Sequence, residues 1–142
     1  EFHYFLIMQI FAFDFGAKYI GIAVGQTITK TSSPLTVLDV KEEGKNLWNT
    51  INALLDEWKP DQLLVGKPLN MDGSDSDMMK IAEKFFKKLK RTSNIPCEFV
   101  DERLTSIEAK KLMNFSKTQS RVDDLAAKIF LDNWMEHYVN SN

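Results

Sequence analysis

Apolar residues fall into short runs along the chain, and their spacing changes from one run to the next. Gln9–Phe13 is almost continuously apolar, which is typical of a strand buried on both faces of a sheet. After a few residues Tyr19–Val24 is again apolar, so the two segments predict a hairpin. A third strand is predicted within Thr31–Val40, where Pro34 lacks a backbone donor and favours a strand start or a sheet edge.

Helices and strands then alternate. From Asn46 apolar residues recur every three or four positions, which predicts a helix that ends before Pro60. Gln62–Gly66 predicts a fourth strand and Ile95–Val100 a fifth, with a helix over Asp77–Leu89 between them. Strands separated by helices pair in parallel through right-handed crossovers. The buried positions expected on the two helices are Leu47, Ile51, Leu54, Leu55 and Trp58, then Met78, Ala82, Phe85, Phe86 and Leu89.

Polar residues mark the expected turns and helix starts. Lys41–Lys45 is charged and contains glycine, so it predicts a turn, and Ser76 is the expected N-cap of the helix that follows it. Thr105–Glu108 has the capping-box pattern and predicts a helix to about Asn114. Ser120 is expected to cap a last helix, whose predicted buried stripe is Leu125, Ala126, Ile129, Phe130 and Trp134.

Composition narrows the class of protein. The 142 residues suffice for one domain with a sizeable core, and the net charge of −2 gives no overall attraction to polyanions or membranes. Cys97 is the single cysteine, which excludes an internal disulfide and favours a cytoplasmic protein. Residues 1–7 precede Met8 and are expected to be cloning-derived or upstream residues, without a signal peptide or membrane span. Residues 8–142 are therefore predicted to form a single domain.

Three acidic residues are predicted to meet at one edge of the sheet. Asp14 ends the first strand and Glu102 follows the fifth, and parallel strands share the edge at which their carboxyl ends lie. Backbones two strands apart are separated by about 10 Å, which suits a pair of divalent ions. Asp123, early in the last helix, completes the cluster if that helix packs across the strand ends. Carboxylate oxygens are ligands that Mg²⁺ and Mn²⁺ prefer.

Each acid also has an ordinary structural explanation. Asp14 could satisfy backbone donors in a turn, and Asp101–Arg103 could form a surface ion pair. Asp123 and Asp124 could stabilise the helix dipole, and one of the two suffices as a ligand. Lysines and an arginine between residues 80 and 91 form either a solvated helix face or a phosphate-contacting patch.

Four motifs in order resemble a known family. They are Asp14–Gly16 with Lys18, Gly21, Ala23 and Gly25, then Val65–Gly73, Asp101–Ser106 and Val122–Ala127. Together they resemble the YqgF family of RNase H-like proteins, described as Holliday-junction-resolvase-like proteins and as pre-16S ribosomal RNA nucleases. The resemblance extends from Met8 to about Tyr138.

The resemblance implies an α/β RNase H-like fold, with a mixed five-stranded sheet of order 3-2-1-4-5, an antiparallel second strand and flanking helices. It implies a metal-dependent phosphodiesterase in which Asp14, Glu102 and Asp123 are both catalytic residues and ligands of Mg²⁺ or Mn²⁺. Related resolvases carry the second acid on strand four, whereas this strand ends in Gly66-Lys67-Pro68, and Asp101 is the alternative ligand.

The remaining site residues follow from the same motifs. Lys18 and Arg103 are candidates for phosphate contacts, and Asn70 and the amide of Gly66 for shaping a substrate groove. The expected reaction is two-metal phosphodiester hydrolysis in the processing of the 5′ end of 16S rRNA. The expected partners are structured RNA or branched DNA and ribosomal precursor particles, with no membrane, for a monomer or homodimer.

Three other functions fit part of the pattern. A junction resolvase acting on branched DNA, or a non-catalytic RNA-binding assembly factor, would keep the same fold. A nucleotide-binding ATPase of the actin and sugar-kinase type shares the first hairpin, but it needs a second such domain, for which 142 residues leave no room.

Overall fold

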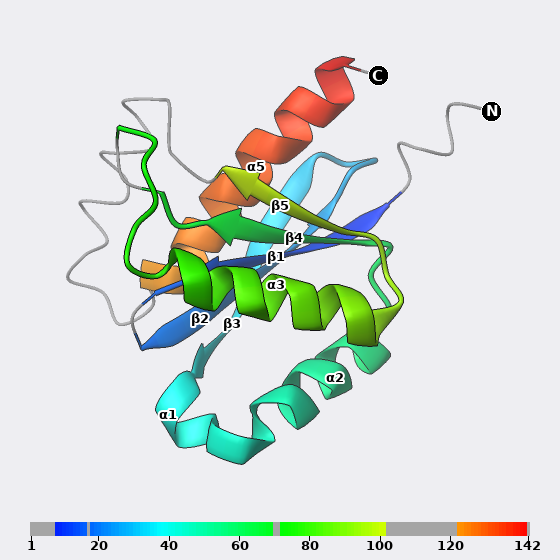
Figure 1. Ribbon diagram of the computed structural model, residues 1–142. Coiled ribbons are helices and arrows are strands. Elements are labelled where there is room, and N and C mark those ends of the chain that lie inside the picture. The colour runs from blue at the N-terminus through cyan, green and yellow to red at the C-terminus, as the bar shows by residue number, and fades with distance from the viewer. Residues whose placement is uncertain (1–7, 17, 70–71, 102–121, 142) are drawn as a thin grey trace.

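The computed structural model describes residues 8–16, 18–69, 72–101 and 122–141 (Figure 1). The strands are β1 (Gln9–Phe15), β2 (Tyr19–Gln26), β3 (Thr31–Asp39), β4 (Gln62–Lys67) and β5 (Cys97–Asp101). The helices are α1 (Val40–Glu43), the 3₁₀ turn η2 (Gly44–Asn46), α2 (Leu47–Trp58), α3 (Met79–Ser93) and α5 (Val122–Ser141).

The strands form one mixed sheet in the order β3-β2-β1-β4-β5. β2 is antiparallel to both β1 and β3, whereas β1, β4 and β5 are parallel to one another. The predicted topology is therefore confirmed. Pro34 lies on the edge strand β3, where the register shifts between Ile22 and Ala23 of its neighbour, as expected for a residue without a backbone donor.

Helices cover both faces of the sheet (Figure 1). Phe11, Phe13 and Phe15 of β1 pack in the larger core with α2 and α3, while Ile10 and Ala12 pack against α5 on the opposite face. This alternation follows from the period of two along a strand. The predicted buried positions of α2 and α3 are confirmed as buried or half-buried members of the larger core. Within the described residues, no helix combines the length and apolarity that crossing a membrane requires.

Small residues let α5 lie close to the sheet. Its buried residues pack over Ala12 and Ala23, and a Cβ added at Gly25 would come within 2.9 Å of Leu131 Cδ2. The predicted stripe of the last helix is partly wrong. The buried positions are Ala127, Ile129, Phe130, Leu131 and Met135, whereas Leu125, Ala126 and Trp134 are half-buried. Because the apolar residues of α5 are not gathered on one face in the sequence, its spacing alone does not select the buried face, and the small residues of the sheet do.

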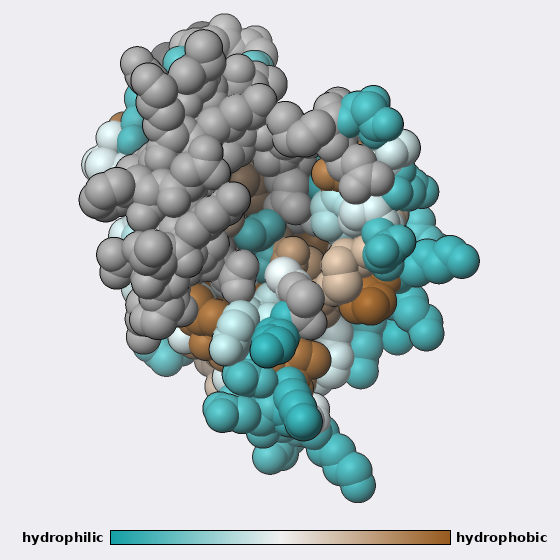
Figure 2. Space-filling view, turned by 90° about the vertical axis from the view of Figure 1, so that its left-hand side faces the viewer, coloured by the Kyte–Doolittle hydropathy of each residue, from teal (hydrophilic) through white to brown (hydrophobic). Residues whose placement is uncertain are grey.

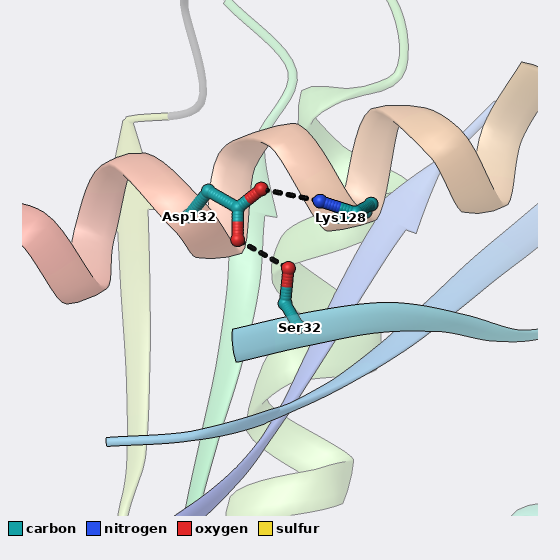
Figure 3. A network of polar contacts seen from close by, with 3 residues as sticks. All are labelled: Ser32, Lys128 and Asp132. Carbon is teal, nitrogen blue, oxygen red and sulfur yellow. Dashed lines mark hydrogen bonds and ion pairs between the residues drawn. The ribbon is translucent and has the colours of Figure 1, made fainter. Parts of the chain in front are cut away.

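Polar contacts hold α5 against both edge strands. The Ser32 hydroxyl of β3 donates to one oxygen of Asp132, and the Lys128 ammonium lies 2.7 Å from the other (Figure 3). On the opposite edge, Trp134 Nε1 donates to the carboxylate of Glu98 in β5 at 3.0 Å. These contacts define where the helix lies across the sheet.

Two predicted boundaries are wrong. The expected turn at Lys41–Lys45 is instead a helical turn, because the Asp39 carboxylate accepts from the amide of Glu42 and caps α1. α3 begins at Met79 after Met78, so Ser76 is not its N-cap; the Ser76 carbonyl accepts from the Met79 amide instead. The helix predicted from Thr105 to Asn114 lies outside the described residues.

Candidate active site

Asp14 lies at the carboxyl end of β1 and is 7% exposed. It follows Ile10 and Ala12 at intervals of two residues, and both of these pack against α5. The carboxylate-bearing residue therefore belongs to the face of the sheet that α5 covers. A carboxylate is rarely buried unless hydrogen bonds or cations compensate its charge, which makes Asp14 unusual among the residues of this core.

Glycines flank Asp14 on both sides. Gly21 of β2 is its direct partner across the hairpin, and directly opposed residues point to the same face. On the other side, the register that pairs Phe13 with Val65 brings Gly66 of β4 level with Asp14. Both glycines are buried. The acid thus lies on a strip of backbone from which the neighbouring strands project no side chain.

The end of β4 carries a glycine at the level of Asp14. Gly66 pairs with Val100 of β5, so Asp14, Gly66 and Val100 form a row across three strands. The outer two backbones of this row are about 10 Å apart. A side chain at position 66 would project from β4 between the side chains of Asp14 on β1 and Val100 on β5. From the sequence, Gly66 was expected to contribute only its backbone amide. Its place beside Asp14 follows from the register of β1 and β4, which the structure gives.

The faces of β5 separate the two acidic candidates at its end. Glu98 contacts Trp134 and Val100 packs in the core beneath α5, so these alternate residues face α5. Phe99 stacks on Phe86 of α3 at 5.0 Å, which places it on the opposite face. By the same alternation Asp101 shares the face of Phe99, away from Asp14. Asp101 is therefore poorly placed as the alternative ligand. Glu102 and Arg103 lie outside the described residues.

The N-terminal end of α5 lies on the same side of the molecule as the carboxyl ends of β1, β4 and β5 (Figure 1). Asp123 and Asp124 are in the first turn of this helix, although the placement of their side chains is not described. The helix covers the face of the sheet that carries Asp14. From the sequence, Asp123 was expected to join the cluster if this helix packed across the strand ends, and the helix does not pack there. The helix contacts β1, β2 and β3.

The other predicted site residues are distributed around this edge. Lys18 is exposed in the turn after β1, and its carbonyl accepts from the Val40 amide at 3.0 Å. Asn70 lies outside the described residues. In the loop after β4, Asp72 accepts from the amide and hydroxyl of Ser74, which forms a tight turn. Figure 2 looks onto this edge and shows a hollow bordered by both apolar and hydrophilic side chains.

Within the described ranges, no three histidine, cysteine, aspartate or glutamate side chains come together as a metal site. The predicted trio includes Glu102 and the side chain of Asp123, so this observation concerns only the part that contains Asp14. What the described part provides is one buried carboxylate, whose oxygens are hard donors, and a floor of two glycines. Carboxylate oxygens are donors that divalent ions such as Mg²⁺ and Mn²⁺ prefer.

Together the sheet order, the acid at the end of β1 and the helix across its face define an RNase H-like fold. The sequence matches the family model RuvX, described as a Holliday junction resolvase, over residues 8–137. The chain therefore belongs to this family, which confirms the resemblance seen in its motifs.

Relatives and solved structures agree with this assignment. Proteins of Saccharophagus degradans and Pseudomonas fluorescens, both named "Putative pre-16S rRNA nuclease", are 42% and 45% identical over 134 and 133 residues. These alignments cover 91% and 89% of this chain, and 94% and 91% of the relatives.

Among solved structures, Thermus thermophilus RuvC with a Holliday junction substrate matches with a TM-score of 0.60 at 11% identity. The alignment covers 94% of this chain and 98% of that one. Fowlpox virus resolvase with Holliday junction DNA gives 0.57 at 18% identity, covering 93% and 99%. At these identities the structures share the fold.

Proposed function

We propose that this protein is a metal-dependent nuclease that hydrolyses phosphodiester bonds in precursor ribosomal RNA, at the 5′ end of 16S rRNA. The observation that carries the proposal is the buried Asp14 at the end of β1, with Gly21 and Gly66 on either side of it. A carboxylate at the end of a strand, flanked by glycines, can hold a cation while a phosphate backbone passes close to the sheet.

Asp14, Glu102 and Asp123 would together hold the divalent ions. Three carboxylates close together repel one another unless cations are bound, so such a cluster is itself a reason for metal binding. Divalent ions, when bound, supply a water of lowered pKa and a countercharge for the leaving oxygen. The faces of β5 favour Glu102 over Asp101, because the residues two and four positions before Glu102 face α5.

The chain's other residues would bind and orient the substrate. Lys18 is exposed at the same end of the sheet and can contact a phosphate as a point charge. Arg103 would contribute the bidentate geometry that guanidinium offers to phosphate. Gly66 and Asn70 would shape the groove. Gly66 has no side chain and so admits the phosphate backbone of the substrate, and the side-chain amide of Asn70 can donate a hydrogen bond to that backbone.

RNA is favoured over DNA as the substrate by the closeness of the relatives. The two relatives named for pre-16S rRNA above are 42% and 45% identical over about nine-tenths of this chain, whereas the two junction resolvases share 11% and 18%. The family description nevertheless names Holliday junction resolvase, so branched DNA is the second candidate. The two substrates are best compared on the same preparation.

The test compares wild type with Asp14→Asn and with a matched control, Asp56→Asn, whose carboxylate is exposed on α2. The substrates are a 5′-extended 16S rRNA precursor and a four-way DNA junction, each with Mg²⁺, with Mn²⁺ and with EDTA. Removing a metal ligand should lower cleavage at least about 100-fold, whereas the control should keep wild-type activity. Cleavage by Asp14→Asn at the wild-type rate overturns the assignment.

Metal binding distinguishes a nuclease from a non-catalytic RNA-binding factor. Calorimetric titration with Mn²⁺ should show binding to wild type and to Asp56→Asn, and weakened binding to Asp14→Asn. If wild type binds RNA but neither binds Mn²⁺ nor cleaves RNA, the protein is a non-catalytic assembly factor and not a nuclease. Cleavage of the junction without cleavage of the precursor would replace RNA by branched DNA in the proposal.

A further inference from the structure

A second feature opens at the same end of the sheet, on the face opposite Asp14. It is an apolar pocket of about 290 Å³ between the ends of β1, α2 and α3. Its lining includes Phe15 and Gly16, which directly follow Asp14 in the chain. Aromatic side chains form much of the rest, since Trp48 stacks on Phe85 with ring centroids 5.0 Å apart. We call this feature the Trp48 pocket.

The rim of the Trp48 pocket is positively charged. Lys84 and Lys88 of α3 line it, and the Lys88 ammonium lies 4.7 Å from the centroid of the Trp48 ring. The helix as a whole carries five lysines and one arginine against a single acid, Glu83, which pairs with Lys87 outside the pocket. An occupant that complements this rim is therefore an anion with an apolar, planar part.

Apolar side chains at the mouth remain in contact with solvent. Ile81 on α3 is 52% exposed and Val40 at the start of α1 is 37% exposed, and both line the pocket. Figure 2 shows apolar side chains between hydrophilic ones on this edge of the molecule. An aromatic platform next to a cationic groove is the combination that proteins use for single-stranded nucleic acids.

We propose that the Trp48 pocket receives an unpaired base of the nucleic-acid substrate, with Lys84 and Lys88 bound to its phosphates. The inference rests on the proposed nuclease function and adds to it a preference for unpaired nucleotides beside the cleavage site. An acidic protein segment would match the charge equally well. Phe15 and Gly16 follow Asp14 by one and two residues. Their position in the pocket favours the nucleic-acid substrate of Asp14 over a protein segment as the occupant.

Lys88 would change partners when the base enters. Its ammonium now occupies a position over the Trp48 ring that a stacked base would take. Because the lysine stem has four rotatable bonds, the ammonium can turn to a phosphate while the base replaces it against the indole. The cation–π contact of the free protein would thus be exchanged for a phosphate contact and a stacking contact.

Binding in EDTA tests the pocket separately from cleavage. The probes are a fluorescein-labelled single-stranded RNA and a blunt RNA duplex of the same sequence, and the measurement is fluorescence anisotropy. Ile81→Trp fills the mouth of the pocket, and Ile28→Trp is the matched control because Ile28 is 64% exposed in the turn between β2 and β3. Circular dichroism establishes that each variant keeps its helices and strands.

Ile81→Trp should weaken binding of the single strand by about 5- to 100-fold and leave duplex binding unchanged, since one stacked base is lost. Ile28→Trp should bind both probes like wild type. Unchanged single-strand binding by Ile81→Trp, or an equal loss for both probes, overturns the inference. Wild-type cleavage of precursor RNA is measured alongside, so a failure of the nuclease function is seen independently of the pocket.

A second experiment tests the phosphate contacts of the lysines, with two double variants that lose the same charge. Lys84→Gln/Lys88→Gln should reduce the slope of log affinity against log salt by about 1.4, because two phosphate contacts to a single strand are lost. Lys87→Gln/Lys90→Gln should reduce it by clearly less, since Lys87 pairs with Glu83 and Lys90 lies over Phe86. Equal slopes for the two doubles overturn the inference. A Trp48 fluorescence response to an acidic phenylalanine-containing peptide, with none to RNA, also overturns it.

Discussion

Gly25 offers a test of how closely α5 must approach the sheet. It is buried in β2 opposite Ile10. An alanine Cβ at this position would lie 2.9 Å from Leu131 Cδ2, 3.1 Å from Met135 Sδ and 3.2 Å from Met135 Cε. Carbon atoms in contact prefer about 3.5–4.0 Å, so the helix or its side chains must retreat by about 0.5–1 Å.

The expected cost is moderate. Leu131 is fully buried and Met135 is 2% exposed, so neither side chain can turn into solvent. Overpacking of this kind costs about 1–3 kcal/mol, and replacing a strand glycine with alanine returns about 0.5–1 kcal/mol. Gly25→Ala should therefore lower the free energy of unfolding by up to about 2.5 kcal/mol, and by about 1 kcal/mol at the middle of the two ranges. Because α5 carries Asp123, a proposed metal ligand, the same shift should lower nuclease activity.

Urea denaturation of a double-mutant cycle isolates the contact. Leu131→Ala alone should cost about 2–5 kcal/mol, but in combination with Gly25→Ala it makes room for the new methyl group. The pair should therefore show a coupling energy of at least about 1 kcal/mol. Gly25→Ala with Phe86→Ala, on the other face of the sheet, is the control and should be additive. Additivity within about 0.5 kcal/mol in the Leu131 cycle would refute the reasoning.

Three further predictions concern other parts of the molecule. Phe86→Ala should lower the free energy of unfolding by about 2–4 kcal/mol in urea, since the half-buried ring stacks on Phe99; a loss below about 1 kcal/mol would contradict this. Ser32→Ala should cost only about 0.5–1.5 kcal/mol by the same measurement, because Asp132 keeps its ion pair with Lys128 (Figure 3). Burial raises the pKa of the Cys97 thiol above its ordinary 9.0, while Ser93 and Lys90 oppose the shift. The folded state thus keeps a proton that the unfolded state loses, and the stability this contributes is present below the ordinary pKa and lost as pH rises through the folded value. Between about pH 8 and pH 10, wild type should lose more unfolding free energy than Cys97→Ala, and equal losses would argue against the assignment.

Local patterns in the chain were enough to predict most of the architecture. The continuous apolar run in Gln9–Phe13, the three-and-four spacing from Leu47 to Trp58 and the Pro60 that follows it are all local features of the chain. The strand–helix–strand order then requires parallel pairing, which is what β1, β4 and β5 adopt. Asp14 could be singled out in the same way, because an acid at the end of a buried strand is conspicuous in the sequence.

The packing of distant segments determined the rest. The apolar residues of α5 are not gathered on one face in the sequence, and the buried face was selected by Gly25 and the alanines of the sheet beneath it. The flanking of Asp14 by Gly21 and Gly66 depends on the registers of three strands that are far apart in the chain. The Trp48 pocket likewise requires α2 and α3 to lie over the end of β1. Periodicity is a property of neighbouring residues. Strand register and the choice of the buried helix face depend on how whole helices and strands pack against one another, so only the folded chain reveals them.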